Sequence, residues 1–366
     1  MKDSMLMLIA AMVVLFYSAD TSAQTLASER DCNFMGGTWQ LTPTPPLYGT
    51  CTLDQYFEVN WTYPLEIQPG VRLEIVGNGH LHVSSPSSVL NTAELVVNGG
   101  RLTNDSTLYL ENRSVLRFDG GVVNNNATLD VQGDVIVNDT PRDPYSNLPD
   151  CVTNKGTLRF HDGGNLLLQG GCIDGKPDGV LRVERDGTMI AYPNSLYRGG
   201  LTDTIWGRFV QHAGAYSEFA NLTLYGEAML EGHTRVTRNN YAVDQMGIFT
   251  IAEGGSAIAA KAALLEIYVP TFEVAGSLRL ESVARLIDDS TLTMAITSSG
   301  LVQLYGGAQA WRSSNFVRVE NAGTIEKSCL SKWYPTREFY GNKIFTQYCR
   351  PVPISPPRLP TPIPLR

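Results

Sequence analysis

The sequence from Leu95 to Gly121 contains the same phrase twice. It opens with LVVNGG and closes with LRFDGG, so an apolar segment followed by a turn returns after about 21 residues. Shorter apolar segments lie between the two phrases, at Leu102 and at Leu108 to Leu110, each bounded by Asn, Asp, Ser or Gly. Three short strands and three turns per period are typical of one coil of a solenoid, whose repeats bury their apolar faces only by stacking on their neighbours.

Apolar residues recur in columns at the same period along most of the chain. Inward-facing residues of successive coils should be alike, while Gly and Asn at the corners take left-handed conformations. The first predicted column consists of Leu73, Leu95, Leu116, Val135, Leu158 and Leu181. The second consists of Leu81, Leu102 and Val123, and the third of Leu108 and Leu129. A later series consists of Leu222, Phe249, Phe272, Leu292 and Phe316. The 34 glycines, 20 prolines and 17% charged residues also favour an all-β chain over one of long helices.

Three segments depart from this rhythm. Thr140 to Cys151 contains three prolines, which cannot donate to a strand ladder, so we expect a loop that leaves the solenoid. Tyr192 to Asn221 is irregular and rich in aromatic residues, which predicts either an insertion or a change in the coil outline. Gly254 to Tyr268 has a composition that suits a helix equally well. Its position within the repeats predicts strands instead.

Residues 1–23 have the three parts of a secretory signal peptide. Lys2 supplies the positive charge, Met5 to Tyr17 the apolar core, and Thr21-Ser22-Ala23 the small-residue cleavage site. We therefore expect a mature chain beginning at Gln24 that is secreted or held at the cell surface, with the periplasm as a further extracytoplasmic location. No later apolar run reaches the roughly 18 residues of a transmembrane helix. The formal charge of -8 disfavours a nucleic-acid partner, which requires a basic face.

Six cysteines in an exported chain predict three disulfides. Fifteen connectivities are possible in principle, but the spacing favours local pairs about one period apart: Cys32 with Cys51, Cys151 with Cys172, and Cys329 with Cys349. The middle pair has a geometric reason as well, because residues one period apart lie about 4.8 Å from each other on adjacent coils. A zinc site is the weaker alternative, since no C-x-x-C occurs and histidines are few.

The chain divides into five predicted regions. Both ends of a solenoid need caps, because an end coil exposes backbone groups and its apolar interior. The N-terminal cap contains CNFMGGTW, which resembles a small disulfide-closed element of exported bacterial proteins, and the aromatic residues Tyr56, Phe57, Trp61 and Tyr63. The regions are residues 1–23 (signal peptide), 24–64 (N-terminal disulfide cap), 65–327 (solenoid), 328–349 (C-terminal disulfide cap) and 350–366 (proline-rich extended tail). The aromatic and basic residues of 328–349 leave a binding face as an alternative to the cap.

Three Asp-Gly pairs are the first candidates for chemistry. Asp119, Asp162 and Asp186 were assigned to one column, with Arg117, Arg159 and Arg182 just upstream. Stacked carboxylates and arginines could form the calcium and arginine site of a polysaccharide lyase or the acid pair of a hydrolase. Asp-Gly after a strand is also what a tight turn requires, and we favour this interpretation. The arginines alternate with apolar residues and should point to solvent.

Histidines and asparagines provide two further patterns. His80 and His82 lie two residues apart on one predicted strand, so both point to the same face and could hold a metal if an adjacent coil supplied a third ligand. His161, His212 and His233 are isolated in sequence. Six N-x-[ST] sequons occur, at Asn60, Asn104, Asn112, Asn126, Asn138 and Asn221. They are either glycosylation sites or part of the turn chemistry of the repeats, and we favour the turns.

The repeated LxVxGG and NxxTL phrases resemble those of exported bacterial β-helix proteins of the pectin-lyase-like and adhesin-like class. The resemblance covers roughly residues 65–327 and implies the fold, while its members range from enzymes to adhesins. We expect one all-β, right-handed parallel β-solenoid of about twelve coils with disulfide-closed end caps.

Two functions fit this fold. The first is a non-catalytic exported structural or adhesive protein. The alternative is a polysaccharide-binding or polysaccharide-degrading β-helix, with residues 192–221 or the proline-rich loop walling a groove. Extracellular glycans or cell-surface components are the expected partners. The sequence assigns no catalytic, cofactor-binding or metal-binding residue and no cofactor.

Overall fold

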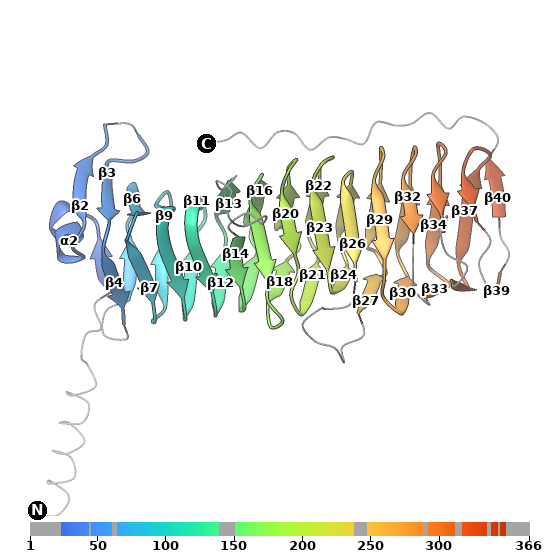
Figure 1. Cartoon of the computed structure of the whole chain (residues 1–366), viewed down its shortest axis with the longest axis horizontal. Helices are drawn as coiled ribbons and strands as arrows, with labels where there is room; N and C mark the ends of the chain where they lie inside the picture. The colour runs from blue at the N-terminus through green and yellow to red at the C-terminus, as the bar shows by residue number, and fades with distance from the viewer. Residues whose placement is uncertain are drawn as a thin grey trace, which may run out of the picture.

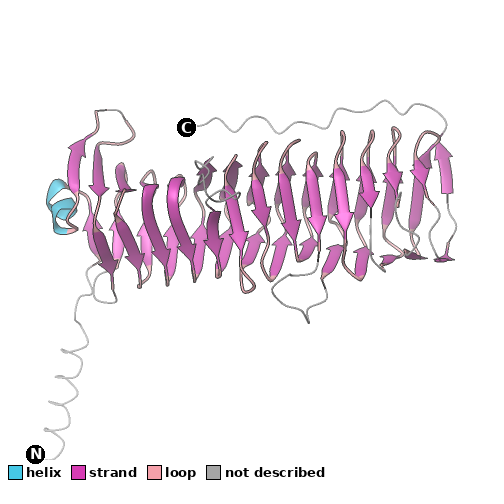
Figure 2. Cartoon of the chain, viewed as in Figure 1, coloured by secondary structure: helices cyan, strands magenta, loops and turns pink. Residues whose placement is uncertain are grey.

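The structure is a computed structural model that describes residues 23–43, 45–60, 64–138, 151–237, 247–287, 292–311, 317–334, 338–342 and 345–348. These residues form a parallel β-solenoid of about twelve turns with one short helix, so the fold class predicted from the repeats is confirmed. Figure 1 shows the coils stacked in a row along the long axis, and Figure 2 shows the helix at one end of an otherwise β chain. The predicted signal peptide and residues 349–366 lie outside the described residues, apart from Ala23.

Each coil contributes a strand to each of three stacks. The first stack is a 14-stranded sheet. Its strands, in stacking order, are β1 (Gln24–Leu26), β5 (Leu65–Ile67), β8 (Ser87–Val89), β10 (Thr107–Leu110), β12 (Thr128–Val131), β15 (Thr157–Phe160), β18 (Val180–Val183), β21 (Thr202–Ile205), β24 (Asn221–Leu224), β27 (Ile248–Ile251), β30 (Thr271–Val274), β33 (Thr293–Ile296), β36 (Arg318–Asn321) and β39 (Glu338–Gly341).

The second stack follows the first around each coil. Its strands are β3 (Gly49–Leu53), β6 (Val71–Val76), β9 (Glu94–Asn104), β11 (Val115–Asn125), β13 (Asp134–Asn138), β16 (Asn165–Gln169), β19 (Thr188–Ala191), β22 (Arg208–Gln211), β25 (Glu227–Leu230), β28 (Ser256–Ala259), β31 (Ser277–Leu280), β34 (Leu301–Leu304), β37 (Thr324–Ser328) and β40 (Phe345–Tyr348). β9 and β11 are long enough to continue around the next corner into the third stack.

The third stack completes each coil. Besides the C-terminal parts of β9 and β11, its strands are β4 (Tyr56–Val59), β7 (His80–Val83), β14 (Cys151–Asn154), β17 (Cys172–Gly175), β20 (Leu196–Arg198), β23 (Tyr216–Phe219), β26 (His233–Val236), β29 (Leu264–Ile267), β32 (Arg285–Ile287), β35 (Gln309–Ala310) and β38 (Lys332–Trp333).

Alternation along the strands builds the core. In β10, for example, Leu108 and Leu110 are buried while Thr107 and Tyr109 face outward, as expected for a strand with one buried face. Successive coils then stack like residues on one another. Phe249 of β27 and Phe272 of β30 pair in register, and their rings are parallel with centroids 4.6 Å apart. Repeated burial of this kind stabilises each coil only through its neighbours.

Part of the first predicted column is wrong. Leu73, Leu95, Leu116 and Val135 do lie above one another in the second stack. The next residue in register is Leu166. Leu158 and Leu181 belong to the first stack, where they continue the third predicted column after Leu108 and Leu129. The chain between the paired residues Val135 and Leu166 is longer than one period, so counting a single period from Val135 ended on the wrong stack.

The other predicted columns largely hold. Leu81, Leu102 and Val123 are in register, as are Leu222, Phe249 and Phe272. The residue paired with Phe272 is Met294, two positions after the predicted Leu292. Phe316 and the proline-rich loop up to Asp150 lie outside the described residues.

The two remaining irregular segments form ordinary coils. Residues 192–221 contain β20 to β23 and the start of β24 without an insertion, so the first of the two alternatives is wrong. The physical reason is that three of the aromatic residues, Tyr197, Phe209 and Phe219, fill the interior instead of marking a loop. Gly254 to Tyr268 contains β28 and β29, which confirms the strands predicted there.

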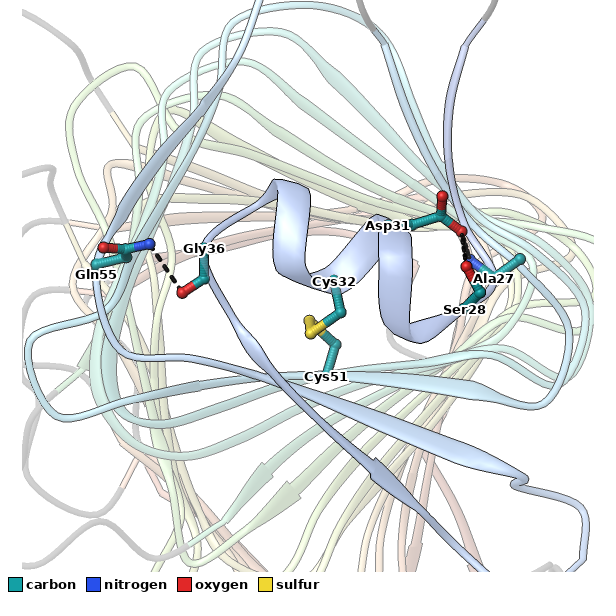
Figure 3. The surroundings of a disulfide bond; sticks show 7 residues. All are labelled: Ala27, Ser28, Asp31, Cys32, Gly36, Cys51 and Gln55. Carbon is teal, nitrogen blue, oxygen red and sulfur yellow. Dashed lines mark hydrogen bonds between the residues drawn. A yellow bond between two sulfur atoms is a disulfide. The ribbon is translucent and has the colours of Figure 1, made fainter.

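The N-terminal end of the solenoid is closed by local structure. β2 (Thr38–Leu41) pairs antiparallel with β3, and helix α2 (Glu29–Phe34) lies across the end of the tube (Figure 3). The predicted disulfide between Cys32 and Cys51 is present and fully buried. Gln55 Nε2 donates to the Gly36 carbonyl at 2.8 Å, which ties the chain after α2 to the first coil (Figure 3).

The remaining cysteines lie on the coils. Cys151 and Cys172 pair in register on β14 and β17, and their Cα atoms are 4.6 Å apart in the disulfide predicted from the coil spacing. Cys329 is disulfide-bonded, while its predicted partner Cys349 lies outside the described residues. The described residues after Cys329 continue the parallel stack through β38, β39 and β40.

Candidate functional site

One corner of the solenoid carries large polar and aromatic side chains on six consecutive coils. We call these residues the corner row: Glu111, Gln132, His161, Glu184, Trp206 and Tyr225. Each directly follows a strand of the first stack, and its backbone N–H donates to the carbonyl of the last strand residue on the preceding coil at 2.7–3.0 Å. Because adjacent strands lie about 4.8 Å apart, the row is roughly 24 Å long.

Two shallow hollows lie along the corner row. The first, of about 380 Å³, is lined by residues that include Tyr109, Glu111, Asp130 and His161. The second, of about 400 Å³, is lined by His161, Asp162, Glu184, Arg185, Asp186 and Trp206. His161 borders both hollows, so they form one continuous surface that runs from β8 to β21.

His161 is held between two carboxylates. Its Nε2 contacts Asp130 Oδ1 on the preceding coil, and its Nδ1 lies 2.8 Å from Asp162 Oδ2 in the following turn. Asp130 is the outward-facing residue of β12, and the side chain is mostly covered by its neighbours. These contacts fix the imidazole in the ridge between the hollows.

Arg159 contacts a carboxylate on each of the two neighbouring coils. Its Nε donates to Glu184 Oε1 at 2.7 Å, and its Nη1 lies 3.3 Å from Asp130 Oδ2. The hydrogen bond with Glu184, followed by the two nearby negative charges, raises the pKa of Arg159 above its ordinary value, while burial opposes the shift. The guanidinium thus remains charged and links three successive coils.

Trp206 and Tyr225 form an exposed aromatic platform at one end of the row. Their rings are nearly parallel, with an interplanar angle of 7° and centroids 5.3 Å apart. Trp206 is 37% exposed and Tyr225 45% exposed. Large aromatic side chains usually bury their faces, so a pair stacked in solvent offers an apolar surface beside the charged hollows.

The structure separates the three predicted Asp-Gly pairs. Asp162 and Asp186 lie in successive turns at the same corner and line the second hollow. Asp119 lies on β11 of the second stack, where it accepts from Arg117 Nε at 2.8 Å, so its assignment to the same column is wrong. The error follows from the shifted column described above. Asp162 adopts the left-handed conformation expected of a turn residue, with φ of 49°.

The predicted arginines also divide between the stacks. Arg159 and Arg182 pair in register on β15 and β18, facing outward as predicted. Arg117 belongs to β11. The sequence therefore identified four residues of the surface, Arg159, Arg182, Asp162 and Asp186, though it could not separate them from Asp119 and Arg117.

Sequence reasoning missed the other half of the site. Asp130, Glu184, Trp206 and Tyr225 were not identified as members of one surface, and His161 was considered isolated. They meet because their coils stack: successive members of the row are 19 to 29 residues apart in the chain, and Asp130 lies two residues before Gln132. The members of the row could have been found from their position alone, because each immediately follows a strand of the first stack.

The sequons lie in different environments. Asn104, Asn125 and Asn154 form a buried ladder, in which each Nδ2 donates to the next Oδ1 at 2.8 Å. The sequon residue Asn104 is therefore structural, as the turn interpretation predicted. Asn138 Nδ2 donates to Asp119 and Asn221 Nδ2 to the Leu201 carbonyl, while Asn60, Asn112 and Asn126 are exposed.

The described parts of the chain hold no group of three or more His, Cys, Asp or Glu side chains arranged to bind a metal ion. No helix within these residues has the length and apolar character needed to cross a bilayer. No family model, curated protein or solved structure matches the chain significantly. The fold and the corner row define the class of molecule, a parallel β-solenoid with a row of polar and aromatic side chains along one corner.

Proposed function

We propose that this protein is a non-catalytic, extracytoplasmic adhesive rod that binds a polysaccharide along the corner row. The observation that carries the proposal is the continuity of the row, in which hydrogen-bonding side chains and a solvent-exposed aromatic platform occupy six successive coils. Carboxylates and guanidinium groups can bind sugar hydroxyls, and aromatic rings can cover the apolar face of a sugar. A concave site with a few convergent polar groups beside aromatic side chains is the usual form of a ligand site.

The disulfides support the location. Cys32–Cys51 and Cys151–Cys172 are bonds that persist in oxidising compartments outside the cytoplasm. This agrees with the secretory signal expected from the first 23 residues. A rod closed at one end by a disulfide-bonded element is suited to present a lateral surface to an extracellular polymer.

Polysaccharide degradation is the second candidate, favoured by the two carboxylates that flank His161. In glycosidases, two carboxyl groups about 5–10 Å apart act on the glycosidic bond. Here the carboxylates of Asp130 and Asp162 both contact the His161 ring, and Asp130 also pairs with Arg159. These contacts favour the ionised form of a carboxyl group, whereas a general acid must be protonated to act on the substrate. We therefore favour binding over degradation.

A glycan-array screen followed by calorimetry tests the proposal. We expect Trp206→Ala and Tyr225→Ala to weaken binding of an array-selected oligosaccharide about fivefold or more, equivalent to about 1 kcal/mol. Tyr340→Ala removes an equally exposed aromatic ring on β39, distant from the row, and should leave the affinity unchanged. The absence of any bound glycan, or equal losses in all three variants, would contradict the proposal. Release of new reducing or unsaturated ends that is lost in Asp130→Asn would establish degradation instead.

A further inference from the structure

A second polar cluster lies on the third stack near the N-terminal end, away from the corner row. β4 and β7 are neighbouring parallel strands in this region (Figure 1), with Tyr56 opposite His80 and Glu58 opposite His82. Because alternate residues of a strand face the same side, all four side chains project outward. The strand pairing thus brings together residues that are more than 20 positions apart in the sequence.

Atoms with lone pairs from three side chains converge within this cluster. Tyr56 Oη lies 3.1 Å from Glu58 Oε2 and 3.3 Å from His82 Nδ1, and His82 Nδ1 lies 4.0 Å from Glu58 Oε1. An ionised carboxylate only accepts hydrogen bonds, and Nδ1 also accepts when the imidazole proton is on Nε2. The phenol hydrogen is then the only one directed between these three side chains, and a cation placed among them could contact a lone pair of each.

The opposite side of His82 is fixed in the orientation that a metal ligand needs. His82 Nε2 lies 2.6 Å from Asp105 Oδ2, and Asp105 Oδ1 accepts from Asn126 Nδ2 at 2.7 Å. With its proton on Nε2, directed at Asp105, the imidazole turns the lone pair of Nδ1 toward Tyr56. Metal-binding histidines characteristically donate their second N–H to a carboxylate in this way.

Glu58 is held as well. Its Oε1 accepts from Ser84 Oγ at 3.2 Å, while Oε2 faces Tyr56. The side chains of Glu58 and His82 are 45% and 24% exposed, so an ion can reach them from solvent. Both ligands are therefore oriented by neighbours without being closed off.

We propose that Tyr56, Glu58 and His82 form a binding site for one first-row transition-metal dication, Cu²⁺ or Zn²⁺. With metal–ligand bonds of about 2.0–2.1 Å, the donors of a tetrahedral site are roughly 3.3 Å apart. The two separations from Tyr56 Oη match this value, and Glu58 must move toward His82 from 4.0 Å to complete the site. Nitrogen and oxygen donors suit copper and zinc. Among divalent first-row metals a given site generally binds Cu²⁺ most tightly, so Cu²⁺ should bind more tightly than Zn²⁺. Binding replaces the phenol hydrogen with the metal and releases that proton to solvent.

The three proposed metal donors are not all histidine, cysteine or acidic residues, so a search for groups of those residue types does not find the site. Two of the three donors are a histidine and a glutamate, and the third is a tyrosine. His80, which the sequence paired with His82, is not part of the set. Its Nε2 is engaged with Thr103 Oγ1 at 3.0 Å, and its ring is stacked beside that of His82 with centroids 6.0 Å apart. His80 therefore provides a matched control on the same strand and face.

Calorimetric titration of the metal-free full chain with Cu²⁺ and with Zn²⁺ tests the site, with metal content measured after dialysis. We expect one equivalent to bind, His82→Ala to abolish binding, and Glu58→Gln and Tyr56→Phe each to weaken it at least tenfold. Asp105→Asn should weaken it about 10- to 100-fold, as loss of such a supporting carboxylate generally does. His80→Ala should keep most of the affinity, because His80 supplies no donor atom and only packs edge-on against the Tyr56 ring, with centroids 5.1 Å apart.

A spectroscopic readout separates a built site from surface histidine binding. The Cu²⁺ complex should show a phenolate-to-copper absorption band that disappears in Tyr56→Phe, while circular dichroism confirms that each variant folds. The proposal is overturned if no stoichiometric binding occurs, if Tyr56→Phe and Glu58→Gln bind like the unaltered chain, or if His80→Ala is as damaging as His82→Ala. Because the cluster lies on another stack, these outcomes are independent of glycan binding at the corner row.

Discussion

The same corner of the solenoid differs sharply between its middle and C-terminal coils. From Glu111 to Tyr225 it carries charged, amide and aromatic side chains. In the next four coils the equivalent residues are Ala252, Ala275, Thr297 and Ala322, whose N–H groups make the same hydrogen bond to the preceding coil at 2.8–3.1 Å. The backbone is therefore repeated while the side chains are not. A repeat fold fixes where a residue points, and the choice of residue then confines a binding surface to part of the rod.

The interior differs between the same two regions. Phe249 and Phe272 stack in an apolar core, whereas the preceding coils bury Asp203 at a position held by Leu181 and Leu222 in the neighbouring coils. Asp203 Oδ1 accepts from Tyr197 Oη at 2.6 Å, but Oδ2 has no hydrogen-bond partner. The coil that carries Trp206 thus contains a buried acid, which makes its stability depend on pH.

The largest expected effect is the loss of stability as Asp203 ionises. Burial raises the pKa of Asp203 from 3.8 to about 7, against hydrogen bonds from Tyr197 and the backbone. Because the folded pKa lies above the unfolded one, the contribution of Asp203 is most favourable below pH 4, declines between pH 4 and 7, and levels off above. A shift of this size corresponds to up to about 4 kcal/mol.

Asp203→Asn isolates this effect. It keeps an acceptor for Tyr197 and cannot ionise, so the difference in unfolding free energy between variant and unaltered chain should grow in favour of the variant from pH 4 to pH 7. Urea denaturation at several pH values measures it. Parallel curves for the two proteins would show that Asp203 is not the buried titrating group.

The disulfide between Cys151 and Cys172 should have the next largest effect. It joins adjacent coils on the third stack, the coils that carry Gln132 and His161, and closes a loop with a sequence separation of 21. Its loss in the double variant Cys151→Ser, Cys172→Ser should cost about 3 kcal/mol, because the unfolded chain gains freedom. Urea denaturation would show this as a lower midpoint than that of the unaltered chain. An unchanged midpoint would mean that the coils need no cross-link at this position.

Asp130→Ala should have an intermediate effect on the middle coils. It removes one of the two partners of each of His161 and Arg159, which keep Asp162 and Glu184, so the loss should be about 1 kcal/mol, the low end of the range for a lost hydrogen bond between buried groups. Glu273→Ala is the matched control, since Glu273 is an outward carboxylate on β30 in the later coils. The control should change stability by less than about 0.5 kcal/mol. Equal losses on denaturation would remove the distinction between the two regions.

The smallest expected effect is a gain. Ala252 follows Tyr225 in the stack, so Ala252→Tyr should extend the aromatic platform by one coil. An added aromatic contact is worth about 0.5–1.5 kcal/mol, which predicts a twofold to tenfold higher affinity for the array-selected glycan. Ala322→Tyr, placed far from the platform, should have no effect in the same calorimetric titration. Equal gains in both would indicate non-specific stickiness of exposed tyrosine.

Much of the fold could be predicted because the repeat constrains every coil. The period identified the stacking, and the coil spacing identified the partners of Cys32 and Cys151. The first column was misassigned because the residues of the predicted loop, Thr140 to Cys151, were counted as part of the period after Val135, whose partner in register is Leu166. Aromatic residues such as Tyr197 and Phe209 were read as signs of an irregular segment, although large rings also fill a solenoid interior.

The candidate surfaces were predicted only in part. Asp162 and Asp186 were recognised because each forms an Asp-Gly pair after a strand. Asp130 and Trp206 belong to no local sequence motif. They can be recognised as parts of the surface only from the strand register, which places their coils on either side of His161 and Glu184. The cluster around His82 was likewise half visible, since His80 and His82 suggested a shared face while the structure shows Glu58 and Tyr56 on the adjacent coil.

A crystal structure of the chain with an array-selected oligosaccharide would test the central claim most directly. The sugar chain should lie along the corner row, with one ring against Trp206 and Tyr225 and others in the hollows beside His161. A glycan bound over Ala252 to Ala322, or on another face of the rod, would contradict the assignment of the corner row as the binding surface.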